Sequence, residues 1–196
     1  MIAAGPELGR PPEFPVNPGG GPCPRFRLRP AGPADAPVLG RLGPATFREA
    51  FGAVLPAEAV AERMRLVYAR ARLAQDLRDP AQAWFLAVAR RGAVGFLALR
   101  EGPPQVPMGG QRPVEFTRVY VRSAWHGRGP AFALMEAGFA EARRRGADLL
   151  WLTAWERNPR ALAFYRAHGF RLADRVPVTF AGQVLPHLLM ARTLSP

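Results

Sequence analysis

One glycine-rich turn has the residue types and spacing to bind a phosphate group: His126-Gly127-Arg128-Gly129-Pro130-Ala131. It follows an apolar run and precedes apolar residues at helical spacing, so a strand should enter the turn and a helix should leave it. Such a junction gathers free backbone N–H groups and the positive end of a helix dipole, where a pyrophosphate fits. The glycines remove Cβ atoms that would block close approach, and Pro130 has the φ favoured at a first helical position. A plain strand-to-helix junction is the alternative.

Two residues that could take part in the chemistry follow at helical spacing. Asn158 and Tyr165 are seven residues apart, so two helical turns bring both to one side of one helix. A phenol with an ordinary pKa of about 10 stays protonated at neutral pH and can donate to a leaving group that becomes negative. The alternatives are structural: Tyr165 as a half-buried packing residue and Asn158 as a helix N-cap.

A carboxylate lies on the strand before the turn. Glu115 is six residues before Val121, where it could take a proton from an amine directly or through water. An ordinary ion pair with a nearby arginine is the alternative.

Two stretches of the chain together resemble the GNAT superfamily of N-acetyltransferases. The family's cofactor motif, Arg/Gln-x-x-Gly-x-Gly/Ala, reads here as His126-x-x-Gly129-x-Ala131, and its downstream half is similar to Trp155 to Tyr165 followed by His168-Gly169-Phe170. The resemblance covers roughly Arg25 to Leu194. The segments Glu115 to Val121 and Trp155-Glu156 look like bacterial polyamine (spermidine/spermine)-type members.

This resemblance implies acetyl-CoA as cofactor and a role for each motif residue. Tyr165 would protonate the departing sulfur, Asn158 would contact the pantetheine arm, and the Val121 N–H would polarise the thioester carbonyl. The predicted catalytic residues are Tyr165, from this resemblance, and Glu115, from its position on the strand. The implied cofactor-binding residues are Val119, Tyr120, Val121, His126, Gly127, Arg128, Gly129, Pro130, Ala131, Asn158 and Tyr165.

Two departures from the family motif should weaken cofactor binding without removing it. His126 replaces the usual arginine or glutamine, which weakens a side-chain contact to phosphate but leaves the backbone donors in place. Pro130 has no N–H, so one possible amide donor is lost.

The elements that must position these residues follow from apolar periodicity and from the Gly and Pro punctuation. We expect strands, helices and loops in this order: strand Arg25–Arg29, helix Pro33 to about Leu42, a helical or looped segment Thr46–Gly52, a helix from Pro56 toward Leu77, a hairpin of Trp84–Ala89 and Val94–Leu99, loop Gly102–Gly110, strand Val114–Val121, a helix ending at Gly146, strand Asp148–Ala154, a helix from Asn158 to Gly169, and strands Phe170–Ala173 and Leu185–Met190.

This order predicts an α/β (α+β mixed) fold. The resemblance implies a GNAT-like mixed, mostly antiparallel central sheet with helices on both faces and a central strand–turn–helix site. The strand–helix–strand unit from Val114 to Ala154 should be a parallel, right-handed crossover, and in the family its first strand splays from its parallel neighbour.

Length and composition predict one domain over residues 25–196 after a disordered Pro/Gly-rich leader over residues 1–24. Cys23 has no intrachain partner, which excludes a disulfide framework.

No apolar run reaches the roughly 18–20 residues of a membrane span, so we expect a cytoplasmic protein without membrane partners. The histidines have no metal-ligand spacing, and no metal is predicted: His126, His168 and His187.

The net charge of +12, carried by arginine, attracts anions but does not distinguish among nucleic acid, an acidic membrane surface and a phosphorylated cofactor.

The motifs and the charge leave three functions open. The first is acetyl transfer to a primary amine by direct attack, with polyamine-like acceptors as the nearest analogue, although a polycation needs more carboxylates than Glu115 supplies. The second is acetylation of a protein N-terminus or lysine, with the loop Gly102–Gly110 shaping the groove. The third, a nucleic-acid-binding module, lacks interleaved aromatic and basic residues. A homodimer is expected by analogy only.

Overall fold

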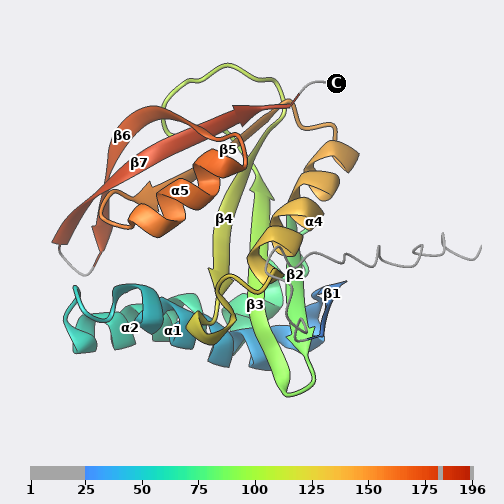
Figure 1. Ribbon diagram of the computed structural model, residues 1–196, viewed down its shortest axis with the longest axis vertical. Coiled ribbons are helices and arrows are strands. Elements are labelled where there is room, and N and C mark those ends of the chain that lie inside the picture. Colours follow the sequence, from blue (N-terminus) through green and yellow to red (C-terminus); the bar gives the residue numbers. More distant parts are fainter. Residues whose placement is uncertain (1–24, 181–182, 195–196) are drawn as a thin grey trace, which may run out of the picture.

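The computed structural model describes residues 25–180 and 183–194, and its centre is one seven-stranded sheet (Figure 1). The strand order is β1-β2-β3-β4-β5-β7-β6, and every neighbouring pair is antiparallel except β4 and β5, which are parallel. The strands are β1 (Phe26–Pro30), β2 (Gln82–Ala89), β3 (Gly92–Glu101), β4 (Pro113–Val121), β5 (Leu149–Trp155), β6 (Arg171–Phe180) and β7 (Gln183–Thr193). The fold predicted from the sequence is confirmed for this part of the chain. The predicted leader over 1–24, with Cys23, lies outside the described residues.

Helices pack on both faces of this sheet and enclose two apolar layers. They are α1 (Ala36–Phe51), α2 (Ala57–Val67), α3 (Arg70–Asp76), α4 (Pro130–Arg144) and α5 (Pro159–Ala167), with short 3-10 turns η1 (Pro33–Asp35) and η2 (Ser123–Trp125). The first three helices bury Leu39 and Tyr68 against Phe96 of β3, and α4 buries Phe139 against Phe116 of β4. The helices on opposite faces therefore reach the middle of the sheet from both sides.

The parallel pair β4 and β5 is joined over a short distance only. Its register contains three residue pairs, from Pro113↔Leu149 to Glu115↔Trp151. Beyond Glu115, β4 remains paired with β3 and β5 remains paired with β7, so the two strands part from each other and follow different neighbours. The splay implied by the family resemblance is therefore present.

The backbone of β4 has unpaired groups along this opening. The Arg122 N–H donates to the Val94 carbonyl on the β3 side at 2.8 Å. Because antiparallel partners alternate along a strand, the N–H of Val121 points to the opposite edge, toward β5. The same alternation places the backbone groups of Val119 on that edge.

The first helix is longer than the sequence predicts. We expected it to end near Leu42, yet α1 continues through Pro44 to Phe51. A proline inside a helix costs about 3 kcal/mol. Burial of Leu39, Leu42 and Phe47 on one face offsets this, since each side chain contributes about 1.5–3 kcal/mol when fully buried.

The second predicted helix is two helices. The chain leaves helical geometry at Tyr68 and Ala69, where Ala69 has φ −56° and ψ 135°. This turn lets the buried Tyr68 ring pack on Gly43 of α1, where any side chain would collide with the ring, and edge-on against Phe96. Tertiary packing therefore divides a helix that local periodicity would have continued.

The last two strands also exceed their expected ranges of Phe170–Ala173 and Leu185–Met190. Pro177 of β6 pairs opposite Pro186 of β7 within the ladder that joins these strands. Proline is tolerated at position 177 because β6 is the edge strand of the sheet, and at position 186 because the residue pairs between β7 and β5 end at His187.

Candidate active site

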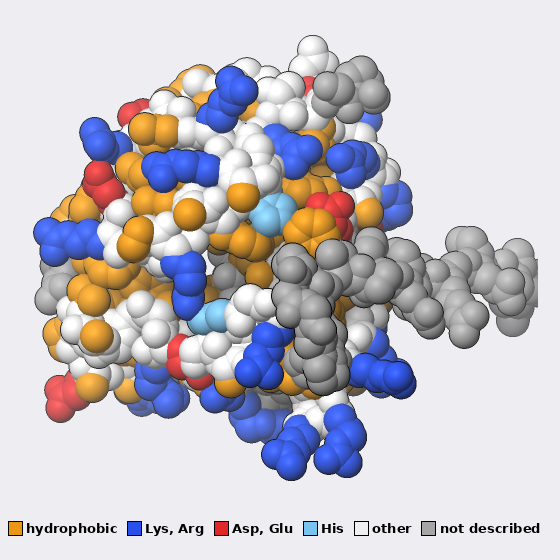
Figure 2. All heavy atoms as spheres, viewed as in Figure 1, with side chains coloured by type: hydrophobic (Ala, Val, Ile, Leu, Met, Phe, Trp, Pro, Cys, Tyr) orange, Lys and Arg blue, Asp and Glu red, His pale blue; other side chains and the backbone are white. Residues whose placement is uncertain are grey.

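A cleft of about 1880 Å³ lies where β4 and β5 part. Its walls come from both strands, from α1 and from the starts of α4 and α5. Figure 2 shows hydrophobic side chains inside a hollow of this face, with arginine side chains near its edge. Ten of the predicted site residues line the cleft: Glu115, Val119, Tyr120, Val121, His126, Gly127, Gly129, Ala131, Asn158 and Tyr165. Residues far apart in the sequence thus share one cavity.

The predicted phosphate turn has the backbone geometry that glycine allows. Gly127 has φ +71° and Gly129 has φ +96°, values that L-residues rarely adopt. Pro130 is buried at the first position of α4. Among the described residues, no hydrogen-bond acceptor is found for the N–H groups of Gly127, Gly129 and Ala131. A Cβ added at Gly127 would meet no atom within 4 Å, so the turn opens onto space that a pyrophosphate could fill.

Both ring nitrogens of His126 are occupied by contacts within the protein, whereas a contact to phosphate was expected for this side chain. Its Nε2 lies 2.9 Å from the Val121 carbonyl, and its Nδ1 is contacted by the guanidinium of Arg160. Because an arginine side chain can only donate hydrogen bonds, Nδ1 of His126 accepts from Arg160. The proton of the neutral imidazole is therefore on Nε2, which donates a hydrogen bond to the Val121 carbonyl. The imidazole therefore links the end of β4 to α5.

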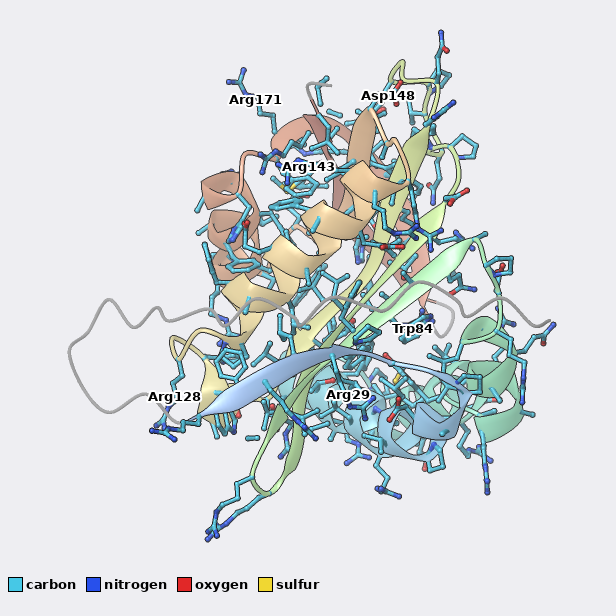
Figure 3. The ribbon with its side chains drawn as sticks, turned by 90° about the vertical axis from the view of Figure 1, so that its right-hand side faces the viewer. Arg29, Trp84, Arg128, Arg143, Asp148 and Arg171 are labelled. Carbon is cyan, nitrogen blue, oxygen red and sulfur yellow. The ribbon has the colours of Figure 1, made fainter. Side chains whose placement is uncertain are left out.

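The remaining member of the turn, Arg128, lies on the loop between β4 and α4. Figure 3 shows its side chain directed outward from the sheet. Arg128 and Pro130 do not line the cleft, although both belong to the predicted motif. Further positive charge at the cleft comes from residues that the sequence motif did not single out, namely Arg25, Arg27 and Arg160.

Asn158 and Tyr165 share one side of α5, as their spacing predicted. The Asn158 Oδ1 accepts a hydrogen bond from the Ala161 N–H at 3.1 Å, which is the N-cap arrangement. Its amide nitrogen remains available to the cleft. The Tyr165 ring packs edge-on against Phe164 and Phe170. Asn158 therefore serves the helix end and the cleft together.

The environment of Tyr165 keeps its hydroxyl protonated. Burial raises the pKa of Tyr165 to about 12, because a buried phenolate loses hydration. Burial also raises the pKa of the neighbouring Tyr120. A proton donor is thus present at the cleft wall at every physiological pH.

Glu115 forms the ion pair that was the alternative to a catalytic role. One carboxylate oxygen lies 2.7 Å from the Arg100 guanidinium on β3, and 16% of the Glu115 side chain is exposed. Both residues line the cleft. Glu115 could receive an amine proton only by exchanging or sharing this partner.

One further contact, which holds the end of β4, could not be predicted from local sequence signals. Glu49 of α1 accepts hydrogen bonds from the Arg122 side chain and from the Ser123 N–H, each at 2.6 Å. Burial alone would raise the pKa of the Glu49 carboxyl, but these bonds outweigh burial and lower it. Because 73 residues separate Glu49 from Arg122, only the fold reveals the contact.

We expect Glu49→Gln to lower the free energy of unfolding at pH 7 by about 1 kcal/mol, the usual size of such hydrogen bonds. Because the pKa of Glu49 is lowered in the folded protein, the stability that Glu49 contributes is complete above its ordinary pKa of 4.5. This stability is lost as the pH falls through the pKa of the folded state. Urea unfolding at pH 7 and pH 4 should therefore show a difference from wild type that shrinks at the lower pH.

The matched control is Glu58→Gln on α2, an exposed glutamate for which the described part of the chain provides no ion pair. It should change stability by less than about 0.5 kcal/mol at both pH values. An equal effect of the two variants would contradict the role given to Glu49.

Residues 25–180 and 183–194 contain neither a cluster of metal-binding side chains nor a helix that could span a membrane. No group of three or more His, Cys, Asp or Glu side chains is arranged to hold a metal ion. No helix there combines the length and apolar character needed to cross a membrane.

Known proteins share this fold and this sequence pattern. An uncharacterised N-acetyltransferase of Mycobacterium bovis is 32% identical over 138 residues, which are 70% of this chain and 84% of that protein. The PaiA N-acetyltransferase of Thermoplasma acidophilum, solved with coenzyme A, superposes with a TM-score of 0.71 at 14% identity, over 87% of this chain and 99% of that one. A GCN5-related N-acetyltransferase of Rhodopseudomonas palustris gives a TM-score of 0.70 at 24% identity, over 90% of this chain and all of that one.

These comparisons show the class of the protein, an enzyme that transfers an acyl group from acyl-coenzyme A to nitrogen. Residues 47–170 match the acetyltransferase (GNAT) family, and the chain belongs to that family. It is an acyl-CoA-dependent N-acyltransferase whose cofactor is acetyl-CoA.

Proposed function

We propose that this enzyme acetylates a primary amine of a small molecule by direct attack, with residues 25–196 acting as one catalytic domain. The observation that carries the proposal is the meeting of three features in one cleft: the phosphate turn, the free edge of β4 and the Tyr165 side chain. Direct attack requires no covalent enzyme intermediate, and the proposed steps use only donors and acceptors that line this cleft.

Four of the predicted residues have a task that their positions support. Acetyl-CoA supplies, when bound, an acetyl group activated as a thioester. The N–H groups of Gly127 and Gly129 hold its pyrophosphate, and the Val121 N–H donates a hydrogen bond to the thioester carbonyl as negative charge develops there. The Tyr165 hydroxyl, protonated because it is buried, donates its proton to the departing sulfur.

The attacking amine must lose a proton, and Glu115 is the carboxylate proposed to receive it. Six residues of strand span about 20 Å, so Glu115 could receive the proton only through a chain of several water molecules along the cleft, and not by direct contact with an amine beside Val121. Its ion pair with Arg100 holds the carboxylate in place at the wall of the cleft.

The nature of the amine is a separate question from the chemistry. A polyamine acceptor would need carboxylates along the cleft, but Asp76 and Glu115 are both paired with arginines there. This charge balance favours a small amine that is not a polycation. Acetylation of peptide amines is the second candidate, which the assay below includes.

The test is to mix the protein with acetyl-CoA and a panel of small amines, polyamines and peptides while following the release of free thiol. We expect thiol release that depends on a small amine, and a product heavier by one acetyl group in mass spectrometry. The chain contains no lysine, so thiol released without an amine cannot come from acetylation of its own lysine side chains. Failure to bind acetyl-CoA would refute the proposal.

A further inference from the structure

Arg118 is a cation inside the cleft that the proposed mechanism does not use. Its guanidinium lies over two aromatic rings, 5.0 Å from the centroid of Trp84 and 5.7 Å from that of Tyr68. The side chain is partly buried, lines the cleft, and has no carboxylate partner within residues 25–180 and 183–194. Figure 3 labels Trp84 on β2, the strand beside β3.

A β-bulge places Arg118 at this position. The register with β3 passes from Leu99↔Phe116 to Ala98↔Arg118, so Thr117 is an extra residue, and its hydroxyl donates to the Ala98 carbonyl at 3.1 Å. Without the bulge, Phe116 and Arg118 would lie on the same face of the sheet. With it, Phe116 packs toward α4 while Arg118 lies on the face covered by α1 to α3.

Two carboxylates that line the same cleft as Arg118 are already paired. Asp76 is bound by Arg72 at 3.0 Å, and Glu115 is bound by Arg100 at 2.7 Å. These two pairs are each neutral, so the part of the cleft that they line with Arg118 has one net positive charge. A partly buried cation is costly without an anion, and stacking on two rings offsets only part of that cost.

The wall of the cleft also contains a buried hydrogen-bond donor. The indole N–H of Trp155 has no hydrogen-bond acceptor among the described residues, and the centroid of its ring lies 5.5 Å from that of Phe51. The Arg118 guanidinium hydrogen-bonds to the Tyr68 hydroxyl, which is a neutral partner, and it has no anionic partner among the described residues. A ligand with a negatively charged oxygen would supply that anion.

We propose that the acceptor amine carries a carboxylate and that Arg118 binds it. The inference rests on the proposed function and specifies its substrate class. Arginine is suited to this task because its planar guanidinium can donate two parallel N–H bonds to a carboxylate. Arg118 is three residues before Val121, about 10 Å along the strand, so one molecule can reach the guanidinium with its carboxylate and the thioester with its amine.

The experiment compares amino acids with their carboxamides, which keep the amine and lose the negative charge. The series contains amino acids in which the distance between the amine and the carboxylate increases. The rate of thiol release gives kcat/KM for each amino acid and for its carboxamide. In the wild-type enzyme we expect the acid to be preferred by about ten- to a hundredfold at one or more lengths, the usual value of a charge-assisted hydrogen bond. Amides that react as well as acids would overturn the inference.

The variants separate charge from packing. Arg118→Met should bring the ratio of acid to amide close to one, and Arg118→Lys should retain part of the preference. Arg192→Met is the matched control, since Arg192 also stacks on a ring, 4.5 Å from the Phe139 centroid, but outside this cleft. It should keep the wild-type ratio. A wild-type ratio in Arg118→Met would also refute the inference, and circular dichroism confirms that each variant is folded.

A binding measurement keeps the inference separate from the proposed function. The N-acetylated acid and its amide are titrated into the complex of the protein with coenzyme A, and the acid should bind at least about tenfold more tightly. Preferential binding without any acetyl transfer would retain the carboxylate site and refute the proposed function. Acetyl transfer without any preference would retain the function and refute the site. A phosphate-bearing amine in the same panel tests whether the site accepts other anions.

Discussion

Gly129→Val is expected to raise the Kd of coenzyme A by about 100-fold or more. Gly129 has φ +96° and immediately precedes Pro130, and a β-branched residue before proline is confined to extended backbone with negative φ. The substitution would therefore turn the free N–H groups of the phosphate turn away from one another. Each hydrogen bond to a charged group contributes about 1.5–3 kcal/mol, so the loss of one or two gives this change in affinity. Isothermal titration with coenzyme A measures it.

The control for this substitution is Gly92→Val at the turn between β2 and β3. Gly92 also has a positive φ, +121°, and a Cβ there would meet no atom within 4 Å. Both variants should lose about 1–2 kcal/mol of stability through backbone strain. Only Gly129→Val should lose coenzyme A, because Gly92 does not line the cleft. Equal losses of affinity would mean that strain, and not the turn, controls binding.

Tyr165→Phe is expected to lower kcat by about 100-fold or more, the usual contribution of a general acid. The variant keeps the ring that packs against Phe164 and Phe170 and removes only the hydroxyl. The Kd of coenzyme A and the Tm should therefore stay close to wild type. A comparable loss in coenzyme A affinity would assign Tyr165 to cofactor binding instead of proton transfer.

The pH dependence of kcat tests the same role by another route. Burial raises the pKa of Tyr165 to about 12, so the hydroxyl keeps its proton below that pH and loses it only above. Tyr165 should thus cause no fall in kcat between pH 7 and 10, and Tyr165→Phe should show a profile of the same shape at a lower level. A fall near pH 8 that disappears in Tyr165→Phe would contradict this assignment.

Much of the site could be predicted because its signals are local. The turn at Gly127 and Gly129 needs positive φ values that few other residues adopt, and the spacing of Asn158 and Tyr165 is that of one helix face. Such features depend on a few neighbouring residues. They are therefore visible in one sequence without knowledge of the fold.

Other parts depend on contacts between distant segments. The passage of α1 through Pro44 is decided by burial against the sheet, and the division of α2 from α3 is decided by the packing of Tyr68 on Gly43. The face on which Arg118 lies depends on the bulge at Thr117, which no local pattern predicts. An arginine directly before the apolar run Val119–Val121 was the available signal for Arg118, but its cleft-facing position required the register with β3.

The parting of β4 from β5 also bears on how the sheet avoids association with other chains. An open strand edge is a template for aggregation, and the two outer edges of this sheet are protected by charge and by proline. Edge strand β1 contains Arg27, Arg29 and Pro30, and edge strand β6 contains Arg171 and Pro177; Arg29 and Arg171 are labelled in Figure 3.

The unprotected edges of β4 and β5 instead face each other inside the molecule. Helices α1, α4 and α5 border the opening between them. A slender linear ligand can pair with these edges there, while a neighbouring protein's strand meets charge and proline at the outer edges. The protein can therefore keep hydrogen-bonding groups exposed for catalysis without a matching tendency to aggregate.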